Sequence, residues 1–309
     1  MSIKYSVIIP HKNIPDLLVR CLDSIPQRND LEIIIVDDNS DPDKVNFNSF
    51  PGVKEPNVKV VLTKEGKGAG YARNIGIEHA RGEWILFADA DDFFLTDNLN
   101  KLLGCEIPDD CELVSWRFVE IDLNGNRKRN NSQKLFDDGL FLVRCEDMMY
   151  QYRFCMTWVR MVKAEMIKRS NIRFEEIEVS NDTMFATMLS VYLDHYYFYN
   201  ADCYCYVKRS NSLMTTNSVE NIKTRCEVAI RVNEFMIKNG KKVSFNGGYG
   251  NWLAQLDYPS FFSVFCSDIR KNGFRNAYRR YSVCCRNYSK ISKIPYLTYL
   301  KRKVKNVFK

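Results

Sequence analysis

The sequence predicts an α/β fold, a Rossmann-type, mostly parallel sheet flanked by helices, with a helical C-terminal extension. Two patterns in the first third of the chain carry this prediction. Four short runs are mainly apolar, which is typical of strands buried on both faces of a parallel sheet. Segments with helical periodicity separate these runs, as in alternating β–α units. The expected strands are residues 5–9, 32–36, 58–62 and 84–87, and the expected helices are residues 16–25 and 70–80.

Each of these elements has a local reason. The first strand is rich in β-branched residues and ends at Pro10, which cannot donate a hydrogen bond to a sheet. The second strand is an unbroken run of Ile and Val that stops at two acids. The second helix follows a glycine-rich entry. The first helix has apolar residues spaced along one helical face, at Leu17, Leu18, Cys21, Leu22 and Ile25.

Composition places the chain among globular proteins. Hydrophobic residues make up 45% of the 309 residues and charged residues 27%, and no apolar run approaches the roughly 18 residues of a membrane span. The N-terminus enters a strand-like run without the apolar segment of a signal peptide. The eleven cysteines are scattered, without a Cys-x-x-Cys pair, so we expect reduced thiols in a cytoplasmic protein. The three histidines follow no metal-ligand spacing.

The net charge of +7 is concentrated in the tail. Residues 270–309 hold 13 Lys and Arg and no acid, which leaves 32 of the 45 basic residues and all 38 acids in the preceding chain. Aromatic residues recur at helical spacing in this tail, which favours peripheral contact with an anionic membrane. The alternative is a helix packed on the main domain with a solvated basic face. Nucleic acid is not expected, because no recognition fold accompanies the charge.

The run from Trp84 to Phe87 ends in three acids, Asp89, Asp91 and Asp92. Carboxylates this close repel one another, and a hard divalent cation such as Mg²⁺ or Mn²⁺ would relieve the repulsion. The alternative is a polar turn in which Asp91 or Asp92 caps the next helix. The second strand also ends in acids. Because parallel strands present their carboxyl ends at one edge of a sheet, both acidic groups should line the same ligand site.

A glycine-rich turn precedes the second helix. Its glycines, Gly66, Gly68 and Gly70, would offer backbone N–H groups and a helix N-terminus to a phosphate, and Arg73 lies one turn further. The pattern is neither that of a dinucleotide-binding dehydrogenase nor that of a Gly-Lys-Ser/Thr phosphate loop. Together with the acids, it suggests a nucleotide diphosphate held by a metal, an arginine and a helix end.

Seven ordered blocks resemble family 2 glycosyltransferases, which have the GT-A fold and generally invert the anomeric centre. The resemblance covers roughly residues 3–215. The blocks are residues 10–13, 36–40, 72–76, 87–92, 157–163, 180–185 and 204–212. It implies a GT-A-like glycosyltransferase domain over residues 1–215, with a nucleotide-binding part at about 1–110 and an acceptor-side part at about 111–215. Residues 216–309 would then form the helical, basic extension.

The resemblance assigns roles on the nucleotide side. Asp38 matches the acid that hydrogen-bonds the nucleobase, and Pro10 begins the loop beside that base. Arg73 matches the arginine near the diphosphate. The resemblance favours a UDP-sugar. Lys12 stands where many members carry an aromatic residue that stacks on the base, and this departure leaves the identity of the base open.

The resemblance also assigns the metal and the general base. Asp89 and Asp91 match the two acids of the Asp-x-Asp motif. Asp91 would meet Mn²⁺ or Mg²⁺ directly, and Asp89 would meet the metal, its waters or the sugar. Asp182 matches the general base. From the residues alone, Asp182 could instead be a helix N-cap, and the glutamates at 175, 176 and 178 are alternative acids.

These roles imply a metal-dependent, inverting hexosyl- or N-acetylhexosaminyltransferase. It would move a sugar from a nucleotide-diphosphate sugar to a hydroxyl of a glycan or lipid-linked acceptor, in bacterial surface polysaccharide synthesis. We expect it in the cytoplasm, in peripheral contact with the inner face of the membrane through residues 270–309. Two alternatives remain: a catalytically inactive glycan- or lipid-binding homologue, and a sugar nucleotidyltransferase.

Overall fold

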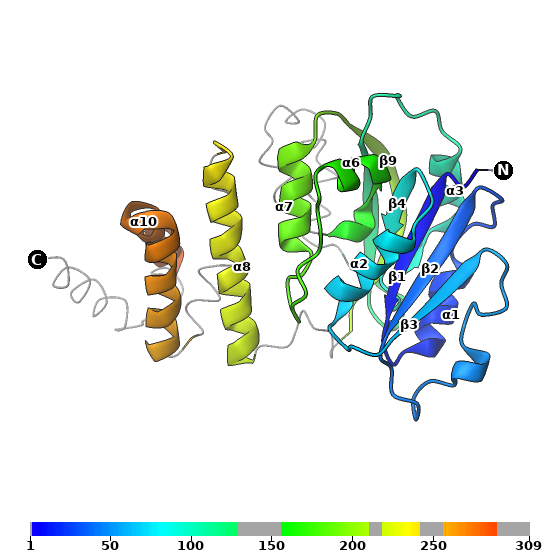
Figure 1. Ribbon diagram of the computed structural model, residues 1–309, viewed down its shortest axis with the longest axis horizontal. Helices are drawn as coiled ribbons and strands as arrows, with labels where there is room; N and C mark the ends of the chain where they lie inside the picture. Colours follow the sequence, from blue (N-terminus) through cyan, green and yellow to red (C-terminus); the bar gives the residue numbers. More distant parts are fainter. Residues whose placement is uncertain (1, 129–155, 210–217, 242–255, 257, 289–309) are drawn as a thin grey trace, which may run out of the picture. The chain divides into compact units, whose positions relative to one another are not determined.

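The computed structural model describes residues 2–128, 156–209, 218–241, 256 and 258–288 (Figure 1). The chain forms two compact units, Met1–Thr216 and Asn217–Lys309. The strands of the first unit are β1 (Tyr5–His11), β2 (Leu31–Asp38), β3 (Val58–Thr63), β4 (Trp84–Phe87), β5 (Phe93–Phe94), β6 (Leu113–Ile121), β7 (Arg127–Lys128), β8 (Arg160–Lys163) and β9 (Tyr196–Val207). Its helices are α1 (Pro15–Asp23), α2 (Ala69–His79), α3 (Thr96–Leu103), α6 (Ala164–Arg169), α7 (Thr183–Tyr192) and the 3₁₀ turns η1 (Phe47–Ser49) and η3 (Thr157–Val159).

The N-terminal half of the sheet is parallel. Its strands lie in the order β3-β2-β1-β4, as the four apolar runs predicted. The chain moves outward from β1 to β3, and α2 then returns it to the far side of β1, where β4 pairs. The strand order therefore reverses at β1. In sheets of this kind, ligands bind beyond the carboxyl ends of the strands at such a reversal.

The second half makes the sheet mixed. β8 runs antiparallel to β4, and β6 runs antiparallel to β8. β9 is parallel to β6, and β5 closes the edge antiparallel to β9. Sequence periodicity missed β6 because polar residues, Ser115, Arg117 and Glu120, interrupt its apolar positions. β9 begins at Tyr196, earlier than the tyrosine-rich block suggested.

Side chains that alternate along the strands separate two cores. Val7 and Ile9 of β1 face one core, where α1 and α3 contribute residues such as Leu18 and Leu99. Ile8 faces the other core, where α2, α6 and α7 contribute residues such as Ala72, Met166 and Phe185. Figure 1 shows α1 and α2 on opposite sides of the sheet. The predicted α/β class, with helices on both faces, is confirmed.

The second unit contains two long helices, α8 (Val219–Lys238) and α10 (Tyr258–Tyr288). They share an apolar cluster that includes Ile222, Phe261 and Phe265. Helix α10 breaks at Gly273, whose φ of 75° is non-helical. The predicted helical extension is therefore present, although residues 289–309 of the basic tail lie outside the described residues. Among the described residues, no helix is both long and apolar enough to cross a membrane.

Candidate active site

The carboxyl ends of β1, β2 and β4 meet at one edge of the sheet. His11 lies opposite Asp37 in the β1–β2 register, and Ile8 lies opposite Phe87 in the β1–β4 register. The residues after these strands therefore emerge together. This topology brings Pro10, the Asp37–Asp38 pair and the acids after β4 to a single region, as the strand pattern predicted.

His11 and Asp37 stabilise the loops that follow β1 and β2. The Ile14 backbone N–H donates to His11 Nε2 at 3.2 Å, so the ring proton is on Nδ1, which donates to Asp37 Oδ2 at 2.8 Å. Asp37 also accepts hydrogen bonds from the Ser40 amide and hydroxyl. Burial opposes ionisation of Asp37, but the hydrogen bonds from His11 and Ser40 outweigh it and lower its pKa. Both Asp37 oxygens are thereby used to shape the loop after β2.

Asp38 holds the glycine-rich turn. Its Oδ2 accepts from the Gly68 backbone N–H at 2.8 Å and lies 3.4 Å from the ammonium of Lys12. Gly66 and Gly68 have positive φ angles of 62° and 92°, which explains the glycines at these positions. The other oxygen of Asp38, Oδ1, is buried and has no hydrogen-bond partner among the described residues. A buried acceptor in this state suits a ligand that carries an N–H donor.

Helix α2 packs directly against the segment before α7. A Cβ atom at Gly70 would lie 2.1 Å from the Glu175 carbonyl oxygen and 3.1 Å from Asn181 Cβ, so only glycine allows this approach. The Glu175 amide in turn donates to the Asn181 carbonyl at 3.2 Å, which closes the segment into a loop. The contact fixes the start of α7 beside the first turns of α2.

Arg73 connects the two sides of the site. Its guanidinium donates to Asp89 Oδ1 at 2.6 Å and to Asn181 Oδ1 at 2.9 Å, and it lies over the Phe174 ring at 5.4 Å. The side chain is almost fully buried, and no described residue hydrogen-bonds its Nε. Arg73 thus joins the acids after β4 to the segment that carries Asp182. Sequence reasoning identified Arg73 but not its Asn181 partner.

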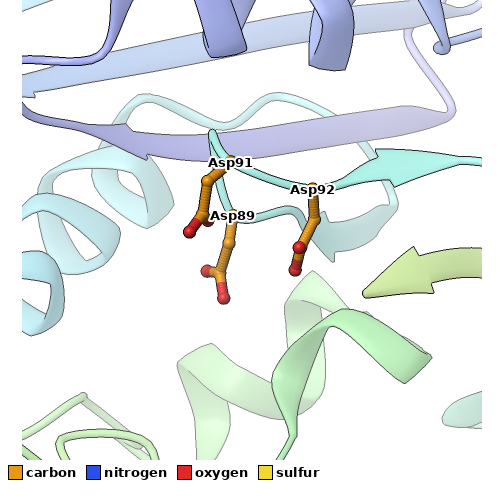
Figure 2. Close-up of side chains that lie close together, drawn as sticks. All are labelled: Asp89, Asp91 and Asp92. Carbon is orange, nitrogen blue, oxygen red and sulfur yellow. The ribbon is translucent and has the colours of Figure 1, made fainter. Parts of the chain in front are cut away.

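Three acids after β4 converge. Asp89, Asp91 and Asp92 each place a carboxylate oxygen within 4.8 Å of the others (Figure 2). Asp92 is held by β9, because it accepts from the Val207 amide at 2.8 Å and from the Tyr204 hydroxyl at 3.3 Å. Burial, and then the charges of Asp91 and Asp89, raise its pKa well above the usual range. Helix α3 is N-capped by residue 95, so neither Asp91 nor Asp92 caps it.

Asp91 is paired with an arginine that sequence reasoning did not single out. Its Oδ2 contacts the Arg209 guanidinium, and its backbone carbonyl accepts from Arg20 at 2.6 Å. Burial and the neighbouring Asp89 raise the pKa of Asp91, whereas Arg209 opposes the shift. Arg209 lies within the block at residues 204–212, so that block was the available signal. Residues 210–212 lie outside the described residues.

The donor set suits a hard divalent cation. No described residue hydrogen-bonds Asp89 Oδ2 or Asp91 Oδ1, so each side chain retains an oxygen that could bind a metal. Carboxylate oxygens alone favour Mg²⁺ or Mn²⁺ over metals that prefer nitrogen or sulfur. The residues present therefore fit the predicted metal.

Asp182 stands at the start of α7, on the far side of Arg73. It occupies the N-cap position, but its side chain makes no capping hydrogen bond. Burial raises the pKa of Asp182 to about 6; the cation of Arg73 lowers it, and the charge of Asp89 raises it. A carboxyl group in this state can gain and lose a proton near neutral pH.

Trp158 packs against the tyrosines of β9 that lie next to the acids. Its ring stacks on Tyr204 at 4.7 Å and on Tyr206 at 5.8 Å, and it meets Phe118 edge-on at 4.9 Å. The Tyr204 hydroxyl also accepts from the Asp89 amide at 2.9 Å. Trp158 therefore positions the tyrosine that orients Asp89 and Asp92.

Comparison with known proteins decides the family. The model of glycosyl transferase family 2 matches residues 6–169, more than half of the chain. The chain belongs to this family. It is therefore a glycosyltransferase, as the ordered blocks implied.

Curated relatives agree with this assignment. An uncharacterised glycosyltransferase of Haemophilus influenzae is 27% identical over 62% of this chain and 75% of its own length. The glycosyltransferase GlyG of Streptococcus pneumoniae is 27% identical over 70% of this chain and 74% of its own. A poly(ribitol-phosphate) β-glucosyltransferase of Bacillus spizizenii is 29% identical over 63% of this chain, but the match spans only 32% of that longer protein.

Solved structures show the same fold. TarS residues 1–349 of Staphylococcus aureus, solved with UDP-GlcNAc, superimposes with a TM-score of 0.65 at 15% identity, covering 93% of this chain and 92% of that one. The mannosyltransferase PcManGT of Pyrobaculum calidifontis, solved with GDP-Man and Mn²⁺, gives a TM-score of 0.54 at 16% identity, covering 100% of this chain and 81% of that one. The predicted GT-A-like fold is confirmed.

Gly70→Ala should damage the site by displacing the loop that α2 contacts. The added methyl group meets a backbone oxygen, so we expect a stability loss of about 1–3 kcal/mol, together with weaker nucleotide binding as Arg73 and Asn181 separate. Urea unfolding and nucleotide titration measure both effects. Gly104→Ala is the control, because its nearest atoms would lie 3.5 Å away at an ordinary helix end. Wild-type stability and affinity in Gly70→Ala would contradict the packing argument.

Proposed function

We propose that this glycosyltransferase uses a divalent metal and moves a hexosyl or N-acetylhexosaminyl group, with inversion, from a nucleotide-diphosphate sugar to an acceptor hydroxyl. One observation carries the proposal: Arg73 joins the acids after β4 to the segment that ends in Asp182. Asp38, the proposed contact for the nucleobase, lies at the same edge of the sheet. These groups match, in order, the parts that a sugar transfer from a nucleotide requires.

The nucleotide would bind across the ends of β1 and β2. Asp38 Oδ1 is a buried acceptor that no described residue hydrogen-bonds, which supports a contact with a nucleobase N–H donor. Pro10 would lie beside the base, and the turn through Gly68 would face the phosphates. The UDP-GlcNAc bound to TarS supports a UDP-sugar, whereas the GDP-Man bound to PcManGT keeps the base open.

Asp91 and Asp89 would hold Mn²⁺ or Mg²⁺. The Mn²⁺ in the PcManGT complex supports this choice of metal. When bound, the cation would neutralise charge that develops on the leaving diphosphate. The chain adds a fixed positive charge of its own through Arg73, whose Nε has no hydrogen-bond partner within the described ranges.

Asp182 would act as the general base. In an in-line displacement, the acceptor oxygen forms a bond to the anomeric carbon while the bond from that carbon to the diphosphate oxygen breaks. The acceptor proton goes to the carboxylate of Asp182. A pKa of about 6 supports this role, because the group is ionised at neutral pH yet basic enough to take a proton.

The acceptor would be a glycan or a lipid-linked saccharide used for a bacterial surface polysaccharide. The poly(ribitol-phosphate) β-glucosyltransferase among the relatives supports a surface polymer. A cytoplasmic enzyme at the inner face of the membrane would meet such an acceptor. The end of the second unit supports peripheral contact, because Phe274 and Tyr278 are about two-fifths exposed beside exposed Arg270, Lys271 and Arg275.

Transfer assays test the reaction directly. Wild type, Asp91→Ala, Asp182→Ala and the exposed control Asp109→Ala would be incubated with UDP-, GDP-, CMP- and dTDP-sugars and Mn²⁺, with donor hydrolysis followed when no acceptor is present. We expect one donor class to turn over in wild type and Asp109→Ala. Chelation should abolish this activity, and Asp91→Ala and Asp182→Ala should each lose about 100-fold or more.

Three other results would contradict this reaction. Equal activity in all four proteins would remove the mechanism. Donor binding without turnover in wild type would favour a catalytically inactive binding homologue. Pyrophosphate release from a nucleoside triphosphate and a sugar phosphate would favour a sugar nucleotidyltransferase.

The rate should depend on the ionisation of Asp182. Because its pKa in the folded protein is about 6, the carboxylate is present above that pH and lost below it. At saturating donor and acceptor, kcat should therefore rise with pH through about 6 and then level off. Asp182→Asn should flatten this profile at a low residual rate. An unchanged pH profile in that variant would exclude Asp182 as the base.

Vesicle binding tests the proposed membrane contact. The combined variant Arg270→Glu, Lys271→Glu and Arg275→Glu reverses the exposed charge beside Phe274 and should sediment less with phosphatidylglycerol vesicles than wild type. Neutral phosphatidylcholine vesicles should bind both proteins weakly. Lys241→Glu is the control within the same unit. Equal sedimentation of wild type and the combined variant would contradict a membrane role for this surface.

A further inference from the structure

Arg209 occupies an unusual place in the site. It follows β9, and its guanidinium contacts Asp91 Oδ2, the side chain that would bind the metal directly. Figure 2 shows the Asp91 carboxylate beside that of Asp89, which is itself paired with Arg73. Each of the two candidate metal ligands therefore already carries an arginine from the protein.

The two arginine pairs are not equivalent. Arg73 is nearly buried and is fixed at its other end by Asn181. The Arg209 side chain is 29% exposed, and its only hydrogen-bond partner among the described residues is Asp91. Its Nε is buried and has no hydrogen-bond partner in the part of the chain that the structure describes. Of the two arginines, Arg209 is therefore the one that can leave its carboxylate more easily, because it is more exposed than Arg73 and has no second partner among the described residues.

A divalent ion and Arg209 would compete for Asp91. Two cations on the same carboxylate repel strongly in a partly buried site. The competition is specific to Arg209, because the other arginine on Asp91, Arg20, binds only the backbone carbonyl and lies over the Phe93 ring at 5.1 Å. A metal bound at the free Oδ1 of Asp91 would lie beside the Arg209 cation on Oδ2, and this repulsion favours the transfer of Arg209 to another acceptor.

Backbone hydrogen bonds keep Arg209 close to the acids. The Val207 amide is tied to Asp92 at 2.8 Å, and the Lys208 amide is tied to the Ile121 carbonyl at 2.8 Å. Arg209 is one residue beyond these anchors, so its side chain can turn while its backbone stays beside the acids. A planar guanidinium with an unused Nε suits the paired oxygens of a diphosphate.

We propose that Arg209 is a stored cation. It holds Asp91 in the ligand-free enzyme and transfers to the donor diphosphate when the divalent ion replaces it. This inference rests on the proposed function, and it adds a positioning residue that couples metal binding to donor binding. It predicts that removal of Arg209 has opposite effects on the two ligands.

Separate titrations of metal and nucleotide test the exchange. In the full-length chain, Arg209→Gln should bind Mn²⁺ without nucleotide several-fold more tightly than wild type, because the competing cation is gone. The same variant at saturating Mn²⁺ should bind UDP, or GDP measured in parallel, about tenfold or more weakly, because a charge-assisted hydrogen bond is lost. Calorimetry, or paramagnetic resonance for Mn²⁺, gives both affinities without an activity assay.

Two further variants make the result specific. Arg209→Lys keeps the charge but loses the fork, so its metal affinity should stay near wild type while its nucleotide affinity falls between those of wild type and Arg209→Gln. Arg28→Gln is the matched control, because Arg28 pairs with Asp30 away from the acids, and both affinities should be unchanged. Thermal midpoints establish that each variant is folded.

Other outcomes overturn the inference in distinguishable ways. If Arg209→Gln weakens both ligands together, Arg209 only supports the local structure. If neither affinity changes, Arg209 has no part in binding. A wild-type chain that binds neither Mn²⁺ nor any nucleotide diphosphate would instead remove the proposed function on which the inference rests.

Discussion

Negative charge crowded at one strand tip is the constraint on which the rest of the site depends. The three acids after β4 approach one another within 4.8 Å, where carboxylates repel. Each of the three carboxylates has different protein partners. Arg73 pairs with Asp89 and Arg209 with Asp91, whereas Asp92 is enclosed by hydrogen bonds from β9. These responses come from separate parts of the sequence, so relief of one local repulsion brings distant segments together.

Arg73 connects these acids to the start of α7. One side of its guanidinium holds Asp89, and the other holds Asn181, the residue before Asp182. The contact is possible because Gly70 lets α2 approach the Glu175 carbonyl. The acids after β4 and the segment that carries Asp182 are therefore not independently placed. A change that loosens one side is transmitted to the other through a single buried cation.

Two carboxyl groups with raised pKa values illustrate how environment separates roles. Burial raises the pKa of both Asp92 and Asp182. Asp92 has both oxygens occupied by protein donors, so its side chain serves the structure. Asp182 makes no capping hydrogen bond although it stands at a helix start, so its carboxylate stays available for a proton. Hydrogen-bond partners, rather than the direction of the pKa shift, distinguish the environments of these two acids.

Local sequence determined the parallel half of the sheet and the acids at its edge. Continuous apolar runs specify strands buried on both faces, and a parallel arrangement places their carboxyl ends together, so Asp38 and the acids after β4 were predictable as neighbours. Local pattern could not reveal β6, whose polar residues mask its periodicity. Nor could it reveal the pairing of Arg209 with Asp91, which joins residues 118 positions apart. Such contacts depend on how the antiparallel strands fold back onto the parallel ones, and only the tertiary packing decides which side chains then meet.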